Sequence, residues 1–186
     1  MVSHRPTPSP TSPVTLLSKC LSLAVEDLHL TSWFLEQGAD PNGQGNFTPL
    51  MAAAEFGTLP CLQLLVDYGG DLERADLLQF AALRKHFGGL EVTDWLLSQH
   101  VNVNTQVSAM NAFSSGSGLD RKYRVQTPLH VAVRFGSYAI AALLLEHKAD
   151  SSLRDSAGMT PLDCLREREG AEGVTDFSRI FIPRVD

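Results

Sequence analysis

The chain has 186 residues, 44% of them hydrophobic and 19% charged, which is the balance of an ordinary soluble globular protein with one sizeable core. Its 15 basic and 21 acidic residues give a net charge of −6, which argues against a general nucleic-acid binder. No apolar run approaches the length of a membrane span and no signal peptide is visible, so we expect a cytoplasmic or nuclear protein.

Residues 1–13, MVSHRPTPSPTSP, form a proline-rich tail that has almost nothing to bury, and we expect it to be disordered. Thr7, Ser9 and Ser12 each precede a proline, so the tail offers proline-directed phosphorylation sites or a polyproline II ligand. The simpler alternative is a solvated terminus with no role of its own.

Three cysteines, Cys20, Cys61 and Cys164, are widely spaced and stand in apolar helical sequence. This arrangement is typical of buried thiols in a reducing compartment rather than of a disulfide framework. We therefore expect all three side chains to be buried.

Two helices are predicted near residues 14–25 and 28–37. From residue 48 onward the helix pairs follow a sharper pattern. Thr48 can cap the first helix of a pair, and Pro49 suits the first helical position, where no amide hydrogen is needed. Such a pair has apolar surface on more than one side, so it needs neighbours to cover it.

The same spacing recurs in two copies of this plan. In each copy a Thr-Pro-Leu motif places its leucine seven residues before a glycine and fifteen before a leucine of the second helix. The residues are Thr48, Pro49, Leu50, Gly57 and Leu65 in one copy, and Thr127, Pro128, Leu129, Gly136 and Leu144 in the other. A third motif, Thr160, Pro161 and Leu162, begins 33 residues after the second. These matching offsets indicate an internal repeat.

A 33-residue period with Thr-Pro-Leu-His, here ending at His130, resembles the ankyrin repeat. The resemblance implies an all-α ankyrin-repeat solenoid of stacked helix-turn-helix pairs with β-hairpin-like finger loops. It also implies that the Thr-Pro-Leu motifs are structural and that His130 hydrogen-bonds within its turn instead of serving catalysis. We expect one ankyrin-repeat domain over residues 14–182. Its repeats are expected near 14–42, 43–72, 73–104, 125–150 and 151–182, with an inserted loop at 105–124.

The two terminal repeats depart from the pattern. The first lacks Thr-Pro-Leu and is interpreted as an N-terminal cap that faces solvent on one side. The fifth begins with Thr160 but then becomes polar, so Arg166, Glu167, Arg168 and Glu169 are expected to face solvent in a C-terminal cap. A last short helix over that end is predicted around Phe177 and Phe181.

The third repeat is the weakest copy, because Leu77 and Leu78 stand where Thr-Pro-Leu is expected. Leu78 precedes Leu96 by eighteen residues instead of fifteen, so either the helix pair or its turn is about three residues longer. Trp33 and Trp95 hold matching places in the second helices, and we predict that both pack between helices.

The inserted loop at 105–124 contains a flexible tract, Ser114 to Gly118, and the densest basic cluster of the chain. The cluster consists of Arg121, Lys122, Tyr123 and Arg124. By resemblance the loop lengthens one finger at the edge of the binding groove, which makes it a candidate recognition loop. The alternative is a mobile insertion without a partner.

No residue pattern in the sequence proposes a catalytic or metal site. The cysteines, histidines and serines lack the spacing of a nucleophile with a base and an orienting group. No His/Cys pair has zinc-ligand spacing, and Phe-Gly-Gly at residues 87–89 lacks the lysine and serine of a phosphate-binding loop. We predict no enzyme, no cofactor and no metal. An enzyme or ligand-binding protein with a site assembled only in space is the remaining alternative.

A phenylalanine stands directly before the glycine that ends the first helix in three successive repeats. By resemblance, the two residues before that glycine vary widely and line the concave face. Here they are Glu55 and Phe56, His86 and Phe87, and Arg134 and Phe135. Either the three rings form an apolar ridge for a partner's anchoring side chains, or each ring folds down to seal its own turn.

These features predict a non-catalytic protein-protein interaction module, an adaptor or assembly subunit that binds another protein through the concave groove and the long finger. The number of repeats also resembles that of ankyrin inhibitors, which regulate an enzyme such as a kinase by occlusion. We expect the chain to be monomeric on its own or a subunit of a larger complex, with no nucleic-acid partner and no membrane span.

Overall fold

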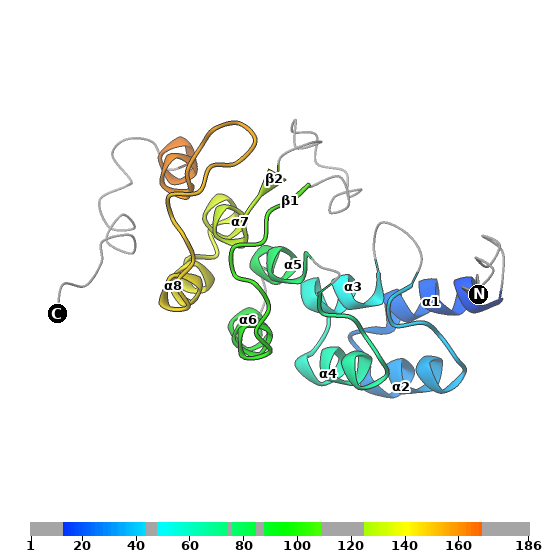
Figure 1. Ribbon diagram of the computed structural model, residues 1–186. Helices are drawn as coiled ribbons and strands as arrows, with labels where there is room; N and C mark the ends of the chain where they lie inside the picture. Colours follow the sequence, from blue (N-terminus) through cyan, green and yellow to red (C-terminus); the bar gives the residue numbers. More distant parts are fainter. Residues whose placement is uncertain (1–12, 44–47, 74–75, 85–87, 109–124, 169–186) are drawn as a thin grey trace, which may run out of the picture. The chain divides into compact units, whose positions relative to one another are not determined.

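The computed structural model describes residues 13–43, 48–73, 76–84, 88–108 and 125–168 (Figure 1). The chain divides into two compact units, Met1–Asp71 and Leu72–Asp186. The tail predicted to be disordered, most of the inserted loop and the short helix predicted near the C-terminal end lie outside the described residues.

Two stacked helix pairs make up the first unit (Figure 1). Its helices are α1 (Pro13–Ala24), α2 (Leu28–Glu36), α3 (Pro49–Glu55) and α4 (Leu59–Asp67). Within each pair the two helices pack together, α1 packs against α3, and α2 packs against α4. Each helix therefore lies on its counterpart in the neighbouring pair, which is the stacking that a structural repeat produces.

Side-chain caps explain where three of these helices begin. Asp27 Oδ1 accepts a hydrogen bond from the Leu30 N–H at 3.1 Å, at the start of α2. Thr48 Oγ1 accepts one from the Met51 N–H at 3.3 Å, and Thr58 caps α4 in the same way. A proline follows Thr48 in the first turn, where its missing N–H costs nothing. These local signals place the helices as the sequence predicted.

The second unit contains two more helix pairs and a short hairpin. Its helices are α5 (Leu77–Leu83), α6 (Gly89–Ser98), α7 (Pro128–Phe135) and α8 (Tyr138–Glu146), and residues 161–168 are also helical. α7 packs against α5, and α8 packs against α6. β1 (Val107–Ser108) pairs antiparallel with β2 (Val125–Gln126) and closes the base of the inserted loop. The predicted all-α architecture is confirmed for the described residues.

Most of the extra residues of the third repeat lie in its turn. α5 has 7 residues, as α3 has, so the first helix is not longer than its counterpart. Five residues separate α5 from α6, whereas three separate α3 from α4. The turn therefore accounts for two of the three extra residues, and the third lies in the second helix, because Leu96 is the eighth residue of α6 whereas Leu65 is the seventh of α4.

The Thr-Pro-Leu motifs start helices in different surroundings. Leu50 and Leu129 are buried in their units, whereas Leu162 is only half-buried. The Thr160 N–H donates to Asp163 Oδ2 at 3.1 Å, and the Asp163 N–H donates to Thr160 Oγ1 at 3.2 Å, which is a capping box. The three prolines of the motifs, Pro49, Pro128 and Pro161, are buried.

Two expectations about burial are wrong in the first helix pair. Cys20 is exposed, whereas Cys61 and Cys164 are buried as expected. Trp33 is half exposed and contacts Phe34 edge-on, with ring centroids 5.0 Å apart, so it is not enclosed between helices. The exposed surface of this pair therefore includes an aromatic ring and a thiol beside its charged side chains.

Candidate partner-binding surface

Phe56 lies at the C-terminal end of α3 with 52% of its surface exposed. The backbone at the next residue, Gly57, lies against Ala53 and Val25. A Cβ on Gly57 would be 2.7 Å from Ala53 Cα and 2.8 Å from the Val25 carbonyl oxygen. Only glycine permits so close an approach. The chain therefore turns directly after Phe56 and leaves an aromatic ring at the helix end.

Glu55, the last residue of α3, has a half-buried carboxyl group beside this ring. Burial raises its pKa from 4.5 to about 7, because removal from water penalises the charged form. Near neutral pH the group therefore exchanges between a carboxylate and a neutral acid. A cationic partner group placed beside it would favour the carboxylate.

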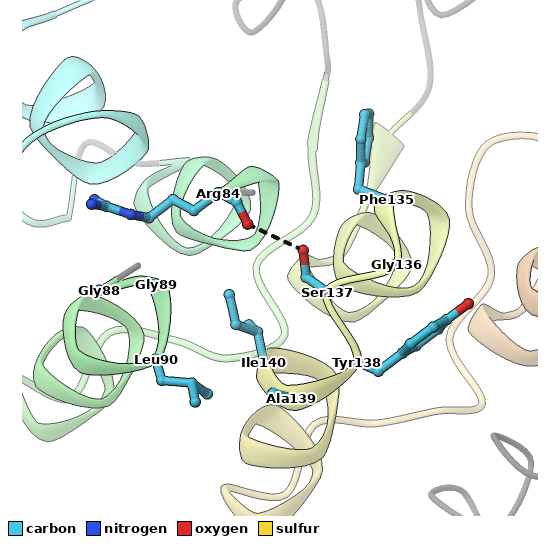
Figure 2. Close-up of a pocket in the computed structure, with 10 residues that line it drawn as sticks. All are labelled: Arg84, Gly88, Gly89, Leu90, Phe135, Gly136, Ser137, Tyr138, Ala139 and Ile140. Atoms are coloured by element: carbon cyan, nitrogen blue, oxygen red, sulfur yellow. Dashed lines mark hydrogen bonds between the residues drawn. The ribbon is translucent and has the colours of Figure 1, made fainter. Parts of the chain in front are cut away.

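A depression of about 560 Å³ opens between the turn from α5 to α6 and the turn from α7 to α8 (Figure 2). The Ser137 hydroxyl donates to the Arg84 carbonyl oxygen at 3.5 Å and joins the two turns, while the Arg84 guanidinium points away from Ser137. The lining residues are Arg84, Gly88, Gly89, Leu90, Phe135, Gly136, Ser137, Tyr138, Ala139 and Ile140. Phe135, predicted to contact a partner, thus lies at an open, partly apolar concavity.

Both turns around the depression depend on glycine. Gly88 and Gly136 have φ angles of 90° and 76°, in the left-handed region that glycine enters without strain. A Cβ on Gly136 would collide with the guanidinium group of Arg168. A Cβ on Gly89 would lie 3.2 Å from Ile140 Cδ1. The depression therefore keeps its shape because these positions carry no side chain.

Arg168 binds the end of α7 to the last described helix. Its Nη1 donates to the carbonyl oxygens of Val133 at 3.4 Å and Arg134 at 3.2 Å. Its guanidinium carbon lies 5.6 Å from the ring centroid of Tyr138, a cation–π contact. Since the last turn of a helix has carbonyl groups without intrahelical partners, this arginine supplements the hydrogen bonding of α7.

Arg134, predicted to contact a partner, is engaged within the chain. Its Nη2 lies 3.4 Å from Asp155 Oδ2 and 3.0 Å from Cys164 Sγ. Its Nη1 lies 3.5 Å from Glu167 Oε2. Burial raises the pKa of the Cys164 thiol, so the sulfur stays protonated near neutral pH. These contacts give Arg134 a role in joining α7 to the following helix.

His130 is fully buried and uses both ring nitrogens. Its Nδ1 lies 2.8 Å from Thr127 Oγ1, and its Nε2 lies 2.9 Å from the Met159 carbonyl oxygen. Because a carbonyl oxygen can only accept, we assign the ring proton to Nε2. Burial is the main cause that lowers the pKa of His130, so the ring is neutral at neutral pH. This arrangement supports a structural role and leaves no nitrogen to act as a general base.

Six of the ten residues predicted to contact a partner lie outside the described residues. They are His86, Phe87, Arg121, Lys122, Tyr123 and Arg124. Phe56 and Phe135 belong to different units, so an apolar ridge across the repeats stays a prediction. Sequence reasoning missed the depression, although adjacent glycines at Gly88 and Gly89 were a usable signal for a turn with open space.

Other kinds of site find no support in the described residues. They hold no group of three or more His, Cys, Asp or Glu side chains placed to bind a metal ion. None of the helices in the described ranges is long and apolar enough to cross a bilayer.

Comparison with known families identifies the repeats. A model of ankyrin repeats in three copies matches residues 21–107, and a model of a single ankyrin repeat matches residues 126–156. Together the two matches cover more than half of the chain, and residues 108–125, most of the inserted loop, separate them.

Several curated proteins are similar to this chain over part of their length. Ankyrin repeat and SOCS box protein 11 of Danio rerio is 34% identical over 116 residues, 62% of this chain and 35% of the relative. Palmitoyltransferase AKR1 of Lachancea kluyveri is 34% identical over 119 residues, 64% of this chain and 13% of the relative. Potassium channel AKT1 of Arabidopsis thaliana is 27% identical over 198 residues, 88% of this chain and 21% of the relative.

The chain thus spans about a third or less of the length of these relatives. The stacked helix pairs, the spaced Thr-Pro-Leu motifs and these matches lead to one conclusion: the chain belongs to the ankyrin-repeat family.

Proposed function

We propose that this chain is a non-catalytic adaptor or assembly subunit of the cytoplasm or nucleus that binds another protein. The contact residues are Phe56 and Phe135, at the ends of their first helices, together with the inserted loop at 105–124. The observation that carries the proposal is the half-exposed ring of Phe56, held by a turn that only glycine permits. Phe135 occupies the same place in its repeat, beside a depression.

Burial of these rings by a partner supplies binding energy. Full burial of a phenylalanine side chain stabilises by about 1.5–3 kcal/mol, so covering the exposed half of Phe56 contributes roughly 1 kcal/mol. Aromatic anchors seated in pockets dominate many protein interfaces. Ankyrin repeats are protein-protein interaction modules, and the net charge of −6 disfavours a nucleic-acid partner.

The test is quantitative affinity purification from native lysate with a Phe56→Glu, Phe135→Glu double variant. Tyr68→Glu is the matched control, because Tyr68 is a similarly exposed aromatic residue at the end of a second helix. Both variants must first keep the helical circular dichroism and melting temperature of the wild type. We expect specific partners to be lost with the double variant and retained with the control.

Partners that persist with the double variant would contradict the role of both phenylalanines. An Arg121→Glu, Lys122→Glu variant would then test the inserted loop by itself. If a captured partner is an enzyme, its activity is measured with added wild-type chain and with the double variant. Inhibition by the wild type alone would identify the occlusion mechanism of ankyrin inhibitors as the specific form of this function.

A further inference from the structure

The negative charge of this chain is concentrated in its first unit. Residues 13–71 contain seven acidic residues against one lysine, a net charge of −6. Residues 72–186 contain 14 acidic residues against 13 basic ones, a net charge of only −1. Complementary charge steers the encounter of two proteins, so the first unit attracts cationic partner groups.

Two adjacent turns of the first unit bring Phe56 close to acidic side chains. The Thr58 N–H donates to the Val25 carbonyl oxygen at 3.3 Å, so the turn between α1 and α2 lies against the turn between α3 and α4. Glu26 and Asp27, which are both exposed, follow Val25 directly. The exposed ring of Phe56 therefore lies at an acidic end of the first unit.

Glu55, which precedes this ring, has no counter-charge within the described part of the chain. Its side chain is half-buried, and no hydrogen bond or ion pair from the described residues reaches its carboxyl group. Burial is the cause that raises its pKa to about 7. Ionisation of a half-buried, unpaired carboxyl group costs free energy, and a cation placed beside it lowers that cost.

The matching position of the fourth repeat holds a charged side chain that is paired. The 79-residue interval between the first two Thr-Pro-Leu motifs matches Glu55 with Arg134. Arg134 lies 3.4 Å from a carboxylate oxygen of Asp155 and 3.5 Å from one of Glu167. A side chain at this place of the repeat can thus meet groups of opposite charge beyond its helix. For Glu55 the charge is reversed, so the complementary group is a cation.

We infer that Glu55 and Phe56 bind a basic segment of a partner protein, in which an arginine or lysine stands beside an apolar side chain. The cation pairs with the Glu55 carboxylate, and the apolar side chain packs on the exposed part of the Phe56 ring. Glu26 and Asp27 attract further basic residues of the same segment. This inference rests on the proposed function, because it names the chemistry of the partner that Phe56 contacts.

Basic side chains suit both parts of this surface. Arginine and lysine carry an apolar stem of three or four CH2 groups, so one side chain can cover an aromatic ring and still place its charge at a carboxylate. An acidic segment would bring a second carboxylate beside Glu55 and would be repelled by the unit as a whole. The surface therefore selects by charge as well as by apolar contact.

The first test selects binders of the full chain from a phage-displayed library of random peptides about twelve residues long. The selection is done at about pH 8, where most of Glu55 is ionised. We expect the enriched peptides to be positively charged and to carry an arginine or lysine next to an aromatic or aliphatic residue. An enriched set that is acidic or uncharged would overturn the inference.

The second test measures the affinity of one enriched basic peptide by fluorescence anisotropy. We expect Glu55→Gln to weaken binding at least about fivefold, since it removes a partly desolvated charge pair. Phe56→Ala should weaken it about tenfold or more through the loss of an aromatic contact. Glu36→Gln is the matched control and should leave the affinity within about twofold. It removes the same charge from an exposed residue of the same unit, at the far end of α2 from Asp27.

Salt dependence separates a charge pair from a structural effect of the substitution. Added NaCl shortens the screening length, which is about 8 Å at physiological ionic strength. We therefore expect high salt to weaken binding to the wild type by a larger factor than binding to Glu55→Gln, because the variant lacks one of the charges. All variants must first show the helical circular dichroism and melting temperature of the wild type.

Three further outcomes would overturn the inference. The first is a library from which the wild type enriches no peptide. The second is a basic peptide that Glu55→Gln binds as tightly as the wild type does. The third is an equal loss of affinity in Glu36→Gln, since that result would assign the recognition to net charge instead of Glu55. If the Phe56→Glu, Phe135→Glu variant still loses its lysate partners in these cases, the proposed function stands and only the cation assignment fails.

Discussion

The helix pairs α1/α2 and α7/α8 follow one plan but differ in what surrounds them. Val133 and Leu144 are fully buried on α7 and α8, whereas Leu23 is almost fully exposed on α1. The fourth pair is also joined to the segment that follows it, because His130 contacts the Met159 carbonyl oxygen and Arg134 pairs with Glu167. The comparison shows that apolar content does not decide burial in a repeat protein, because burial depends on which neighbours are present.

The largest expected difference in stability between the two helix pairs comes from the packing of their leucines. Leu144→Ala should lower the free energy of unfolding by roughly 2–5 kcal/mol, because it opens a cavity in a core that cannot fully close. Leu23→Ala should change it by less than about 0.5 kcal/mol, since Leu23 is exposed. Urea unfolding followed by circular dichroism measures both. Equal losses of stability in the two variants would contradict the difference in burial between Leu144 and Leu23.

A second pair of variants compares the turns that follow the two helix pairs. Asp155 Oδ1 accepts the N–H groups of Ala157 at 2.9 Å and Met159 at 3.0 Å, and this residue is buried. Asp155→Ala should therefore cost roughly 1–3 kcal/mol, because it removes a buried carboxylate that accepts two backbone hydrogen bonds and pairs with Arg134. Asp40→Ala is the control, because Asp40 is exposed and accepts the Asn42 N–H. Thermal unfolding should show the smaller shift for Asp40→Ala.

For helix-capping residues we expect the larger loss of stability in the α1/α2 pair, the reverse of the order expected for the packing variants. Asp27 caps α2 through two backbone N–H groups, whereas Ser137 makes no side-chain cap at α8. Asp27→Ala should destabilise by about 1 kcal/mol, and Ser137→Ala by only a few tenths. Chemical denaturation of both variants tests this order. A larger loss for Ser137→Ala would mean that its contact with Arg84 matters more than capping.

The smallest expected effect depends on pH. Glu55 and Arg134 hold the same repeat position, but Arg134 is paired with carboxylates and Glu55 is half-buried. Because burial raises the pKa of Glu55 from 4.5 to about 7, the folded state binds the proton more tightly than the unfolded state. Its contribution to stability therefore falls as pH rises through that interval and stays low above it.

Glu55→Gln removes this dependence. The stability of the variant relative to the wild type should rise between pH 5 and pH 8, as measured by urea unfolding at both values. The magnitude is modest, because the half-exposed carboxylate is partly screened by water. No change with pH would show that Glu55 keeps an ordinary pKa in the folded chain.

The sequence predicted the elements of the fold whose signals are local. Thr48 and Thr127 cap helices whose first turn contains a proline, and both effects act within three residues. The matching offsets of their motifs then indicated the repeat. Local chemistry and spacing were sufficient to predict the helix pairs and the ankyrin family.

Burial and pairing could not be predicted in the same way. Cys20 lies in apolar sequence that resembles core sequence, but its exposure depends on whether another helix pair covers α1. Arg134 meets Asp155 and Glu167, which lie 21 and 33 residues away in the sequence. The depression is formed by two turns about fifty residues apart. These features depend on tertiary contacts that the spacing of a motif does not contain.

The two-residue strands at the base of the inserted loop have a consequence for how this protein can vary. The insertion lengthens the interval between matching second-helix positions from 31 to 48 residues. For a flexible loop each doubling of length costs only about 0.6 kcal/mol of loop-closure entropy, because the cost grows with the logarithm of length. Since β1 and β2 return the chain to the stack at one place, the loop between them is open to change in length and composition with little effect on folding.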